Sequence, residues 1–270
     1  MLIDGRHIGA DVRNKVATAF AHSKKNLTLG VLSIGGDAVT EQFIRIKKKA
    51  ADAIGIPVID VALPEEVSTD DVLRALTDLI ARTNAVVVQL PLPAHVDRAR
   101  IFSALPASHD VDCLGDEARA SFENGGPLLP PVVAACKEIL ERYSVAVAGK
   151  SVVVVGRGVL VGAPAAKWFS RQGAAVNVLD ENDSIAVYTQ SADIIVLGAG
   201  HPGLLKPDMI QKGVVVLDAG TSESGGRVIG DADPACAEKA LLLTPVPGGV
   251  GPVAVAKIFE NLLICNSIPF

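Results

Sequence analysis

Short apolar runs alternate with charged stretches along the first half of the chain. The runs at residues 27–33, 57–63 and 85–89 are bounded by polar residues and are rich in Val, Ile and Leu. Such runs are typical of buried strands, and the periodic charged stretches between them are typical of helices. The pattern therefore predicts a βαβ rhythm with parallel strands.

A second series of four apolar runs begins after residue 150. These runs are VVVV at 152–155, AVNVL at 175–179, DIIVLGAG at 193–200 and VVVLDAG at 214–220. Strands in such a series predict a Rossmann-like doubly wound parallel sheet. The whole chain is expected to form an α/β fold of two α/β lobes with a cleft between the lobes.

Two segments flank this second series. Residues 106–131 are rich in Pro, Gly, Asn and acidic side chains without a sustained period, so we expect a loop or active-site rim, followed by a helix to Tyr143. The last helix is expected near residues 253–263, after a Pro/Gly loop, and is expected to fold back on the first lobe.

The composition argues against several classes of partner. The chain has 270 residues, of which 49% are hydrophobic, enough to fill more than one core. Its 25 basic and 30 acidic residues give a net charge of -5 without a long Lys/Arg block, so we expect no nucleic-acid partner. The longest apolar stretches have five to seven residues, far below the roughly 20 that cross a bilayer, and the charged N-terminus shows no export signal. We therefore expect no membrane association.

The cysteines give a weaker indication of the compartment. The four residues are Cys113, Cys136, Cys236 and Cys265. They show neither CxxC spacing nor the density of a disulfide framework. Reduced thiols, a cytoplasmic location and no metal site are therefore expected.

A glycine-rich loop opens the second series. VVVVGRGVLVGAP places Gly156, Gly158 and Gly162 directly after a predicted strand and at the start of a helix. Backbone N–H groups in such a loop can approach a pyrophosphate closely. The G-x-G-x-x-x-G spacing is one residue longer than the common fingerprint, and glycines at such a turn can serve packing alone. We predict a dinucleotide site here.

The choice between NAD and NADP stays open. Asp180 ends the next predicted strand, where an acidic residue hydrogen-bonds the adenosine ribose and repels a 2'-phosphate. Arg157 inside the glycine loop argues for NADP, because a guanidinium beside the ribose accommodates that phosphate. Asp180 can also be a solvated turn residue.

A predicted helix at residues 38–54 carries three successive lysines. Its expected apolar stripe consists of Val39, Phe43, Ile46, Ala50 and Ile54, at about 100° per residue. Lys47 lies at the edge of this stripe, whereas Lys48 and Lys49 point away from it. Burial near the stripe would lower the pKa of Lys47, so that it can donate to a reacting nitrogen or, when neutral, take a proton. Three such lysines are more often a solvated helix face.

Four segments resemble, in order, the bifunctional methylenetetrahydrofolate dehydrogenase/cyclohydrolase family, called the FolD family. They are VVQLPLPAHVD at 87–97, HDVD at 109–112, GKSVVVVGRGVLVGAP at 149–164 and TPVPGGVGP at 244–252. The resemblance covers most of the chain. It implies hydride transfer from 5,10-methylenetetrahydrofolate to NAD(P), with NADP as the family's usual cofactor, and then hydrolysis of the methenyl product to 10-formyltetrahydrofolate.

The resemblance also implies a role for individual residues. The helical lysine that drives chemistry on the methylene carbon is Lys47, the assisting glutamine is Gln89, and the aspartate that anchors the pterin is Asp112. Asp112 can accept two donors from the pterin, and Gln89 can bridge Lys47 to substrate. Without the resemblance, Gln89 would be read as satisfying loop backbone groups and Asp112 as a turn residue.

Further residues complete the expected site. The substrate-binding set is Phe43, Asp112, Pro91, Gly248, Gly249 and Pro252. The cofactor-binding set is Gly156, Arg157, Gly158, Gly162, Asp180 and Thr221. The resemblance implies a folate-binding catalytic domain at 1–140, an NAD(P)-binding Rossmann domain at 141–250, a C-terminal helix at 251–270 that returns to the first domain, and a homodimer.

Four departures from the family pattern fall in functional segments. Phe43 replaces a tyrosine, a Pro-Cys-Thr-Pro segment reads PPVV at 130–133, a cofactor-loop serine is Gly158, and DVDGFH reads DVDCLG. We expect the cyclohydrolase step to be weakened more than the dehydrogenase step, because hydration also needs water activation. The alternatives are a catalytically silent paralogue that binds dinucleotide or folate, and an NAD(P) dehydrogenase of a non-folate substrate.

Overall fold

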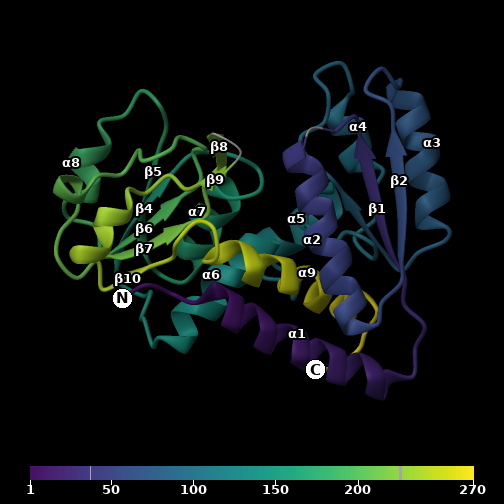
Figure 1. The fold of residues 1–270 in the computed structure, drawn as a ribbon, viewed down its shortest axis with the longest axis horizontal. Helices are drawn as coiled ribbons and strands as arrows, with labels where there is room; N and C mark the ends of the chain where they lie inside the picture. The colour runs from purple at the N-terminus through teal and green to yellow at the C-terminus, as the bar shows by residue number, and fades with distance from the viewer. Residues whose placement is uncertain (37, 225–226) are drawn as a thin grey trace. The chain divides into compact units, whose positions relative to one another are not determined.

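The computed structural model of the chain describes residues 1–36, 38–224 and 227–270. Two compact units make up the chain (Figure 1). Unit 1 comprises Met1–Gly9 and Val132–Ala254, and unit 2 comprises Ala10–Pro131 and Val255–Phe270. The boundaries fall within helices α1 (Gly5–Ser23) and α9 (Val250–Cys265) and at the start of α6 (Pro131–Arg142). The domain ranges expected from the sequence place these boundaries elsewhere, at residues 140 and 250.

Unit 2 is built on a three-stranded parallel sheet of order β2-β1-β3. The strands are β1 (Leu29–Ile34), β2 (Val58–Leu63) and β3 (Ala85–Val88), within two residues of the predicted runs. Every residue of β1 and β3 is buried, because helices cover both faces. Such strands have no polar face, which explains their continuous apolar sequence.

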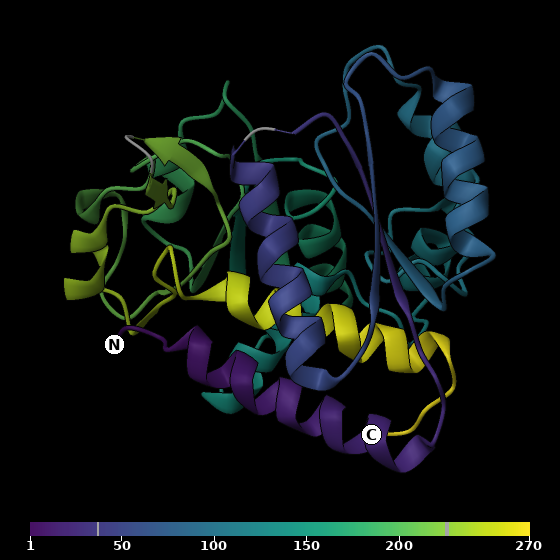
Figure 2. The ribbon, with the colours of Figure 1, turned by 45° about the vertical axis from the view of Figure 1, so that its right-hand side comes forward.

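Two helical layers enclose this sheet, as Figure 2 shows from a second direction. Leu29 and Val31 of β1 pack with α1, α2 (Ala38–Ile54) and α9 in one core. Leu32 and Ile34 pack on the other face with α3 (Thr69–Ile80) and α4 (Arg98–Ser103). A further helix, α5 (Asp116–Glu123), lies within the segment for which the sequence predicted only a loop.

The buried face of α2 differs from the predicted stripe. Ile46 is 41% exposed, whereas Ile44, left out of the prediction, is 8% exposed and packs in the core with Ala50 and Ile54. The side chain of Val39 lies outside the described residues. The stripe is rotated around the helix because the neighbouring helices and the sheet, rather than the local pattern, choose the buried face. Lys47, three residues after Ile44, therefore lies within the buried face rather than at its edge.

Unit 1 contains a five-stranded parallel sheet of order β10-β7-β6-β4-β5. The strands are β4 (Ser151–Val155), β5 (Ala175–Leu179), β6 (Ile194–Leu197), β7 (Val215–Asp218) and β10 (Leu242–Leu243). The order confirms the doubly wound sheet, and β10 is an additional strand. The strand order of this sheet reverses at β4. The loops after β4 and β6 therefore diverge there and leave room for a ligand.

The helices and the hairpin of unit 1 complete the fold. They are α6, α7 (Gly162–Arg171), α8 (Ile185–Thr189), the 3-10 helices η1 (Pro207–Met209) and η2 (Pro234–Glu238), and the antiparallel hairpin β8 (Ser222–Ser224) and β9 (Arg227–Ile229). None of the helices in the described ranges is long and apolar enough to span a bilayer.

The N-terminal residues extend unit 1. Leu2 forms a parallel bridge to Leu243 at the edge of the sheet. The first turns of α1 then approach the loop after β10 so closely that a Cβ on Gly5 would lie 1.8 Å from the carbonyl oxygen of Gly249. The sequence did not reveal this helix, because its opening residues carry charges without a clear stripe.

Candidate functional site

In unit 2, polar side chains gather at the carboxyl ends of β1 and β3. The strand order reverses between these two strands, and ligands of open α/β sheets bind at such points. Gln89 directly follows β3, and its backbone N–H continues the ladder by donating to the carbonyl of Leu32 at 2.8 Å. Lys47 comes from α2, the helix that follows β1. The fold thus brings together two residues that lie 42 positions apart.

Lys47 and Gln89 are joined by a short hydrogen bond. Lys47 Nζ donates to Gln89 Oε1 at 2.7 Å, and Gln89 Nε2 donates to the carbonyl of Leu90 at 2.7 Å. Gln89 is 7% exposed, so this acceptor is fixed and shielded from water. Burial lowers the pKa of Lys47, as predicted, while the nearby Asp112 carboxylate acts in the opposite direction.

Asp112 reaches the same place from a loop beside β3. Val86 forms a parallel bridge with Asp110, so Asp112, two residues further on, lies level with the end of β3. Burial raises the pKa of Asp112 to about 6, with Lys47 opposing this and Asp110 adding to it. The structure thus brings Lys47, Gln89 and Asp112 together, each from a different element.

The loop that carries Asp112 is shaped by the preceding aspartate. Asp110 is fully buried, and its carboxylate accepts from the backbone N–H groups of Gly115 at 2.6 Å and Asp112 at 3.3 Å. Burial raises the pKa of Asp110, and these N–H groups oppose the rise. Within this loop, Cys113 has a φ of 55°, in the left-handed region that favours glycine, which the DVDGFH pattern has at this position.

A buried asparagine on α9 holds the same loop from the other side. Asn261 is 3% exposed and donates through Nδ2 to the carbonyls of Val111 and Leu129, both at 2.8 Å. These bonds connect α9 to the residue between the two aspartates and to the segment before Pro130. Sequence reasoning missed Asn261, since no local pattern marks a contact with a residue 150 positions away.

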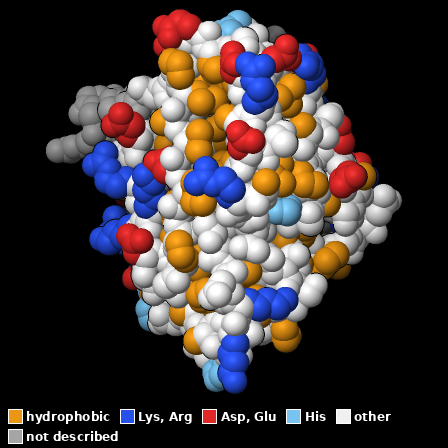
Figure 3. All heavy atoms as spheres, turned by 90° about the vertical axis from the view of Figure 1, so that its right-hand side faces the viewer, with side chains coloured by type: hydrophobic (Ala, Val, Ile, Leu, Met, Phe, Trp, Pro, Cys, Tyr) orange, Lys and Arg blue, Asp and Glu red, His pale blue; other side chains and the backbone are white. Residues whose placement is uncertain are grey.

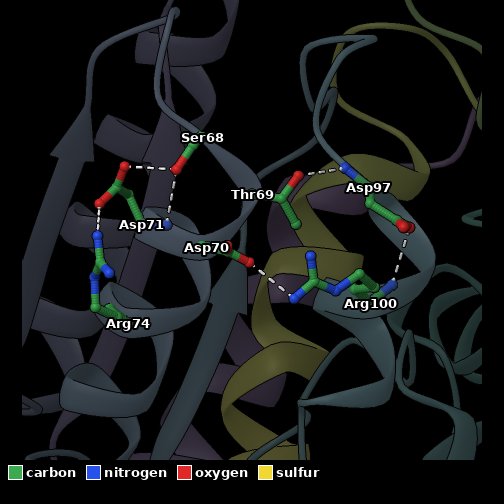
Figure 4. A network of polar contacts seen from close by, with 7 residues as sticks. All are labelled: Ser68, Thr69, Asp70, Asp71, Arg74, Asp97 and Arg100. Carbon is green, nitrogen blue, oxygen red and sulfur yellow. Dashed lines mark hydrogen bonds and ion pairs between the residues drawn. The ribbon is translucent and has the colours of Figure 1, made fainter.

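The segment after Gln89 is fixed at its far end by a polar network (Figure 4). Asp97 N donates to Thr69 Oγ1 at 2.9 Å, Arg100 pairs with Asp70 at 2.8 Å, and Ser68 caps the first turn of α3 by accepting from Asp71 N at 3.2 Å. Figure 3, with the α3 side toward the viewer, shows acidic and basic side chains between apolar patches on this exposed face. Exposed ion pairs add little stability, so the contribution of this network to stability is small.

Two other departures from the family pattern lie on helices α2 and α6. Phe43, one turn before Lys47 on α2, is half-buried and has no hydroxyl. Pro131 is the first residue of α6, and Val133 in the same segment is buried in unit 1.

In unit 1, the glycine loop has the geometry of a phosphate cradle. Gly156 has a φ of 104°, and a Cβ on Gly162 would lie 1.9 Å from the carbonyl oxygen of Gly156. A Cβ on Gly158 would meet nothing within 4 Å. No side chain caps the N-terminus of α7. Ala163 N donates to the carbonyl of Gly158 at 3.1 Å and Pro164 has no N–H, so the N–H of Gly162 is the one in the first three residues of α7 that can face an anion. The loop therefore fits the pyrophosphate of a dinucleotide.

Asp180 and Arg157 form an ion pair at the end of β5. Arg157 Nε donates to Asp180 Oδ2 at 3.0 Å, and Arg157 Nη2 donates to the carbonyl of Val178 at 3.1 Å. The backbone N–H of Asn182 and the Arg157 guanidinium hold the pKa of Asp180 below its usual range. The two residues whose charges argued for opposite cofactors are thus in direct contact.

Two buried carboxylates shape the neighbouring loops. Asp231 accepts from the N–H groups of Ala199 at 2.7 Å and His201 at 2.8 Å, after β6. Asp218 accepts from Gly220 N at 2.9 Å, after β7, and burial raises the pKa of Asp218 to about 6. Thr221, the residue after Gly220, is exposed. The contacts of Asp231 with Ala199 and His201 could not be predicted from the sequence, because these residues lie about 30 positions away.

The expected residues Gly248, Gly249 and Pro252 also belong to unit 1. Gly248 has a φ of 111°, which a glycine adopts without strain. A Cβ on Gly249 would lie 2.6 Å from the carbonyl oxygen of Pro245. Pro252 stands in the first turn of α9, where its missing N–H costs no helical hydrogen bond.

Comparison with known proteins places the chain in a family. Residues 3–112 match the tetrahydrofolate dehydrogenase/cyclohydrolase catalytic domain, and residues 130–268 match the NAD(P)-binding domain of the same family. A protein of Lactobacillus delbrueckii subsp. bulgaricus named bifunctional protein FolD is 32% identical over 270 residues, covering 97% of this chain and 95% of that protein.

Solved structures agree with this match. Bifunctional FolD from Campylobacter jejuni superposes with a TM-score of 0.93 at 29% identity, covering 99% of this chain and 98% of that one. The Trypanosoma brucei enzyme, complexed with NADP and an inhibitor, gives a TM-score of 0.93 at 30% identity, covering 99% and 97%. On these matches over nearly its whole length, the chain belongs to the tetrahydrofolate dehydrogenase/cyclohydrolase family.

Proposed function

We propose that this protein oxidises 5,10-methylenetetrahydrofolate to 5,10-methenyltetrahydrofolate with NAD(P)+ and hydrolyses the methenyl product to 10-formyltetrahydrofolate. In the first step a hydride passes from the methylene carbon to NAD(P)+. In the second step a water molecule is added and a proton is released. The observation that carries the proposal is the Lys47–Gln89 hydrogen bond of 2.7 Å, with Asp112 near enough to influence the pKa of Lys47.

Lys47 is the proposed catalytic residue. Gln89 Oε1 occupies one of the three donor positions of the ammonium, which leaves two for a folate nitrogen or a water. Because burial lowers the pKa of Lys47, the neutral amine is reached more readily than in an exposed lysine and can take a proton from attacking water. One side chain can thus serve both steps by changing its protonation state.

Asp112 is the proposed anchor of the pterin ring. An ionised carboxylate can accept the ring N–H and the amino group together, which fixes the ring in one orientation. A pKa of about 6 keeps the carboxylate mostly ionised at neutral pH. Phe43 supplies an aromatic face for the substrate, and Pro91 stiffens the segment after Gln89.

The dinucleotide, when bound, supplies the hydride acceptor. Gly156, Gly158 and Gly162 form the proposed pyrophosphate cradle, and Asp180 with Arg157 lies at the ribose end. Thr221, Gly248, Gly249 and Pro252 are proposed as further ligand contacts of unit 1, on the strength of the family pattern.

We expect the two activities to differ in strength. Loss of one positioned donor costs on the order of 100-fold in rate, and Phe43 lacks the hydroxyl that the family places one turn before the lysine. This hydroxyl bears on Lys47 and hence on water activation, whereas hydride transfer depends chiefly on positioning. The cyclohydrolase step is therefore the weaker one.

Calorimetric titration with tetrahydrofolate and with each dinucleotide, combined with separate assays of both steps, tests the proposal. Affinity for both ligands with turnover supports it. Affinity without turnover would identify a silent binding protein, and turnover of dinucleotide without folate affinity would identify a dehydrogenase of another substrate. Equal activities at the level of typical family members would refute the ranking.

The quaternary structure and compartment are also part of the proposal. The family pattern supports a homodimer, which sedimentation velocity of the full chain will test. The four cysteines are free thiols, a state typical of reducing compartments, and this supports a cytoplasmic location.

A further inference from the structure

Unit 1 places an acidic residue, Asp180, directly beside the glycine loop. We propose that the protein selects NAD+ over NADP+ and that Asp180 is the residue that determines this selectivity. The inference rests on the proposed function only in requiring that a dinucleotide binds at the glycine loop. It departs from the cofactor that the family resemblance implies.

The register of the sheet places Asp180 at the ribose end of the cradle. Val155 of β4 pairs with Leu179 of β5, and Gly156 N donates to the carbonyl of Leu179 at 2.9 Å. Asp180, the residue after Leu179, therefore lies immediately beside the glycine loop. In a doubly wound sheet, the residue at the end of this second strand faces the adenosine ribose.

The Asp180 carboxylate is charged and has capacity for a ribose hydroxyl. Its Oδ1 accepts from Asn182 N at 3.0 Å and from Asn182 Nδ2 at 3.3 Å, and its Oδ2 accepts from Arg157 Nε. A carboxylate has about four acceptor positions, so one remains beyond these three donors. The lowered pKa of Asp180 keeps it ionised at neutral pH, in the form that accepts from a hydroxyl and repels a phosphate.

Arg157 does not counteract this charge as a free guanidinium would. Its Nε donates to the Asp180 carboxylate and its Nη2 donates to the carbonyl of Val178, so both nitrogens are held at the end of β5. A 2'-phosphate would either meet the carboxylate or have to draw Arg157 away from it. The ion pair itself is weak, because its side chains are 59% and 39% exposed, so the selectivity comes from the charge of Asp180 and not from the strength of the pair.

Calorimetry on the full chain tests this inference with two pairs of ligands, NAD+ with NADP+ and ADP-ribose with 2'-phospho-ADP-ribose. In each pair, we expect the wild type to bind the ligand without the 2'-phosphate at least about tenfold more tightly. One contact between like charges near a surface has an effect of this size. Asp180→Asn keeps the shape and removes the charge, and should shift the ratio at least about tenfold toward the phosphorylated ligands. Glu181→Gln removes the same charge from the next, exposed residue and should leave the ratio unchanged.

The outcomes separate this inference from the proposed function. If the wild type binds NAD+ and NADP+ equally, or binds NADP+ more tightly, the proposed selectivity is wrong, and no variant is needed to show this. A preference for NAD+ that persists in Asp180→Asn would overturn the role of Asp180. The ADP-ribose pair reports on the adenosine end alone, so a protein that binds no folate and turns over no substrate would still give a decisive answer.

Discussion

Replacing Gln89 with leucine removes the acceptor that holds Lys47. Leucine has a similar volume, so the change takes away the 2.7 Å hydrogen bond while largely filling the space. A hydrogen bond to a charged group contributes about 1.5–3 kcal/mol, and its loss leaves a shielded ammonium with less solvation. At 1.36 kcal/mol for each tenfold change, the ratio of ammonium to neutral amine at Lys47 should fall about 10- to 100-fold.

Competitive acetylation across a pH series measures this change directly. Only the neutral amine reacts, so mass spectrometry of the Lys47 peptide gives the pH at which the side chain loses its proton. We expect Gln89→Leu to move that pH downward, further from the ordinary lysine value than in the wild type. The exposed Lys49 on the same helix serves as the internal reference for the reagent.

A matched substitution controls for changes in hydrophobicity. Gln42→Leu makes the same replacement on the exposed side of α2 and should leave the titration of Lys47 where it is in the wild type. An unchanged or raised titration pH in Gln89→Leu, with thermal unfolding like that of the wild type, would refute the reasoning that this hydrogen bond stabilises the ammonium.

Three further predictions address other parts of the molecule. Phe43→Tyr restores the hydroxyl near Lys47 and should raise the cyclohydrolase rate by at least about tenfold and the dehydrogenase rate by less, measured in separate spectrophotometric assays; an equal rise in both would count against the ranking. Gly162→Ala places a Cβ 1.9 Å from the carbonyl oxygen of Gly156 and should weaken dinucleotide binding at least about tenfold by calorimetry; binding like that of the wild type would count against the cradle. Because burial raises the pKa of Asp112 to about 6, its ionised form destabilises the fold, so Asp112→Asn should gain stability relative to the wild type as the pH rises, by up to about 3 kcal/mol between about pH 4 and about pH 7. Denaturant unfolding at both pH values measures this, and a gain at the lower pH instead would reverse the assignment.

The sheets and the glycine loop could be predicted from the sequence because their patterns are local. Buried parallel strands are continuous apolar runs, and the glycines stand directly after one of them. The lowered pKa of Lys47 was anticipated, yet the buried face of its helix was not, since Ile44 and Ile46 are both isoleucines and only packing decides which is buried.

Other features depend on contacts that no local pattern encodes. Asn261 donates to carbonyls 150 and 132 positions away, and Asp231 reaches the loop after β6 from a later segment. Helix α5 was hidden in a polar segment, because its eight residues are mostly polar and a glycine, Gly115, stands at its N-cap. The ion pair of Arg157 with Asp180 joins two residues whose charges, taken separately, point to different cofactors.

Lys47→Met provides the most direct test, since methionine keeps the length of the side chain and removes its nitrogen. One-carbon turnover should fall at least about 100-fold, while calorimetric affinities for tetrahydrofolate and dinucleotide stay within a few-fold of the wild type. Lys49→Met, on the exposed side of the same helix, should retain full turnover. Undiminished conversion of methylenetetrahydrofolate by Lys47→Met would contradict the proposed chemistry, although the dinucleotide site of unit 1 would remain.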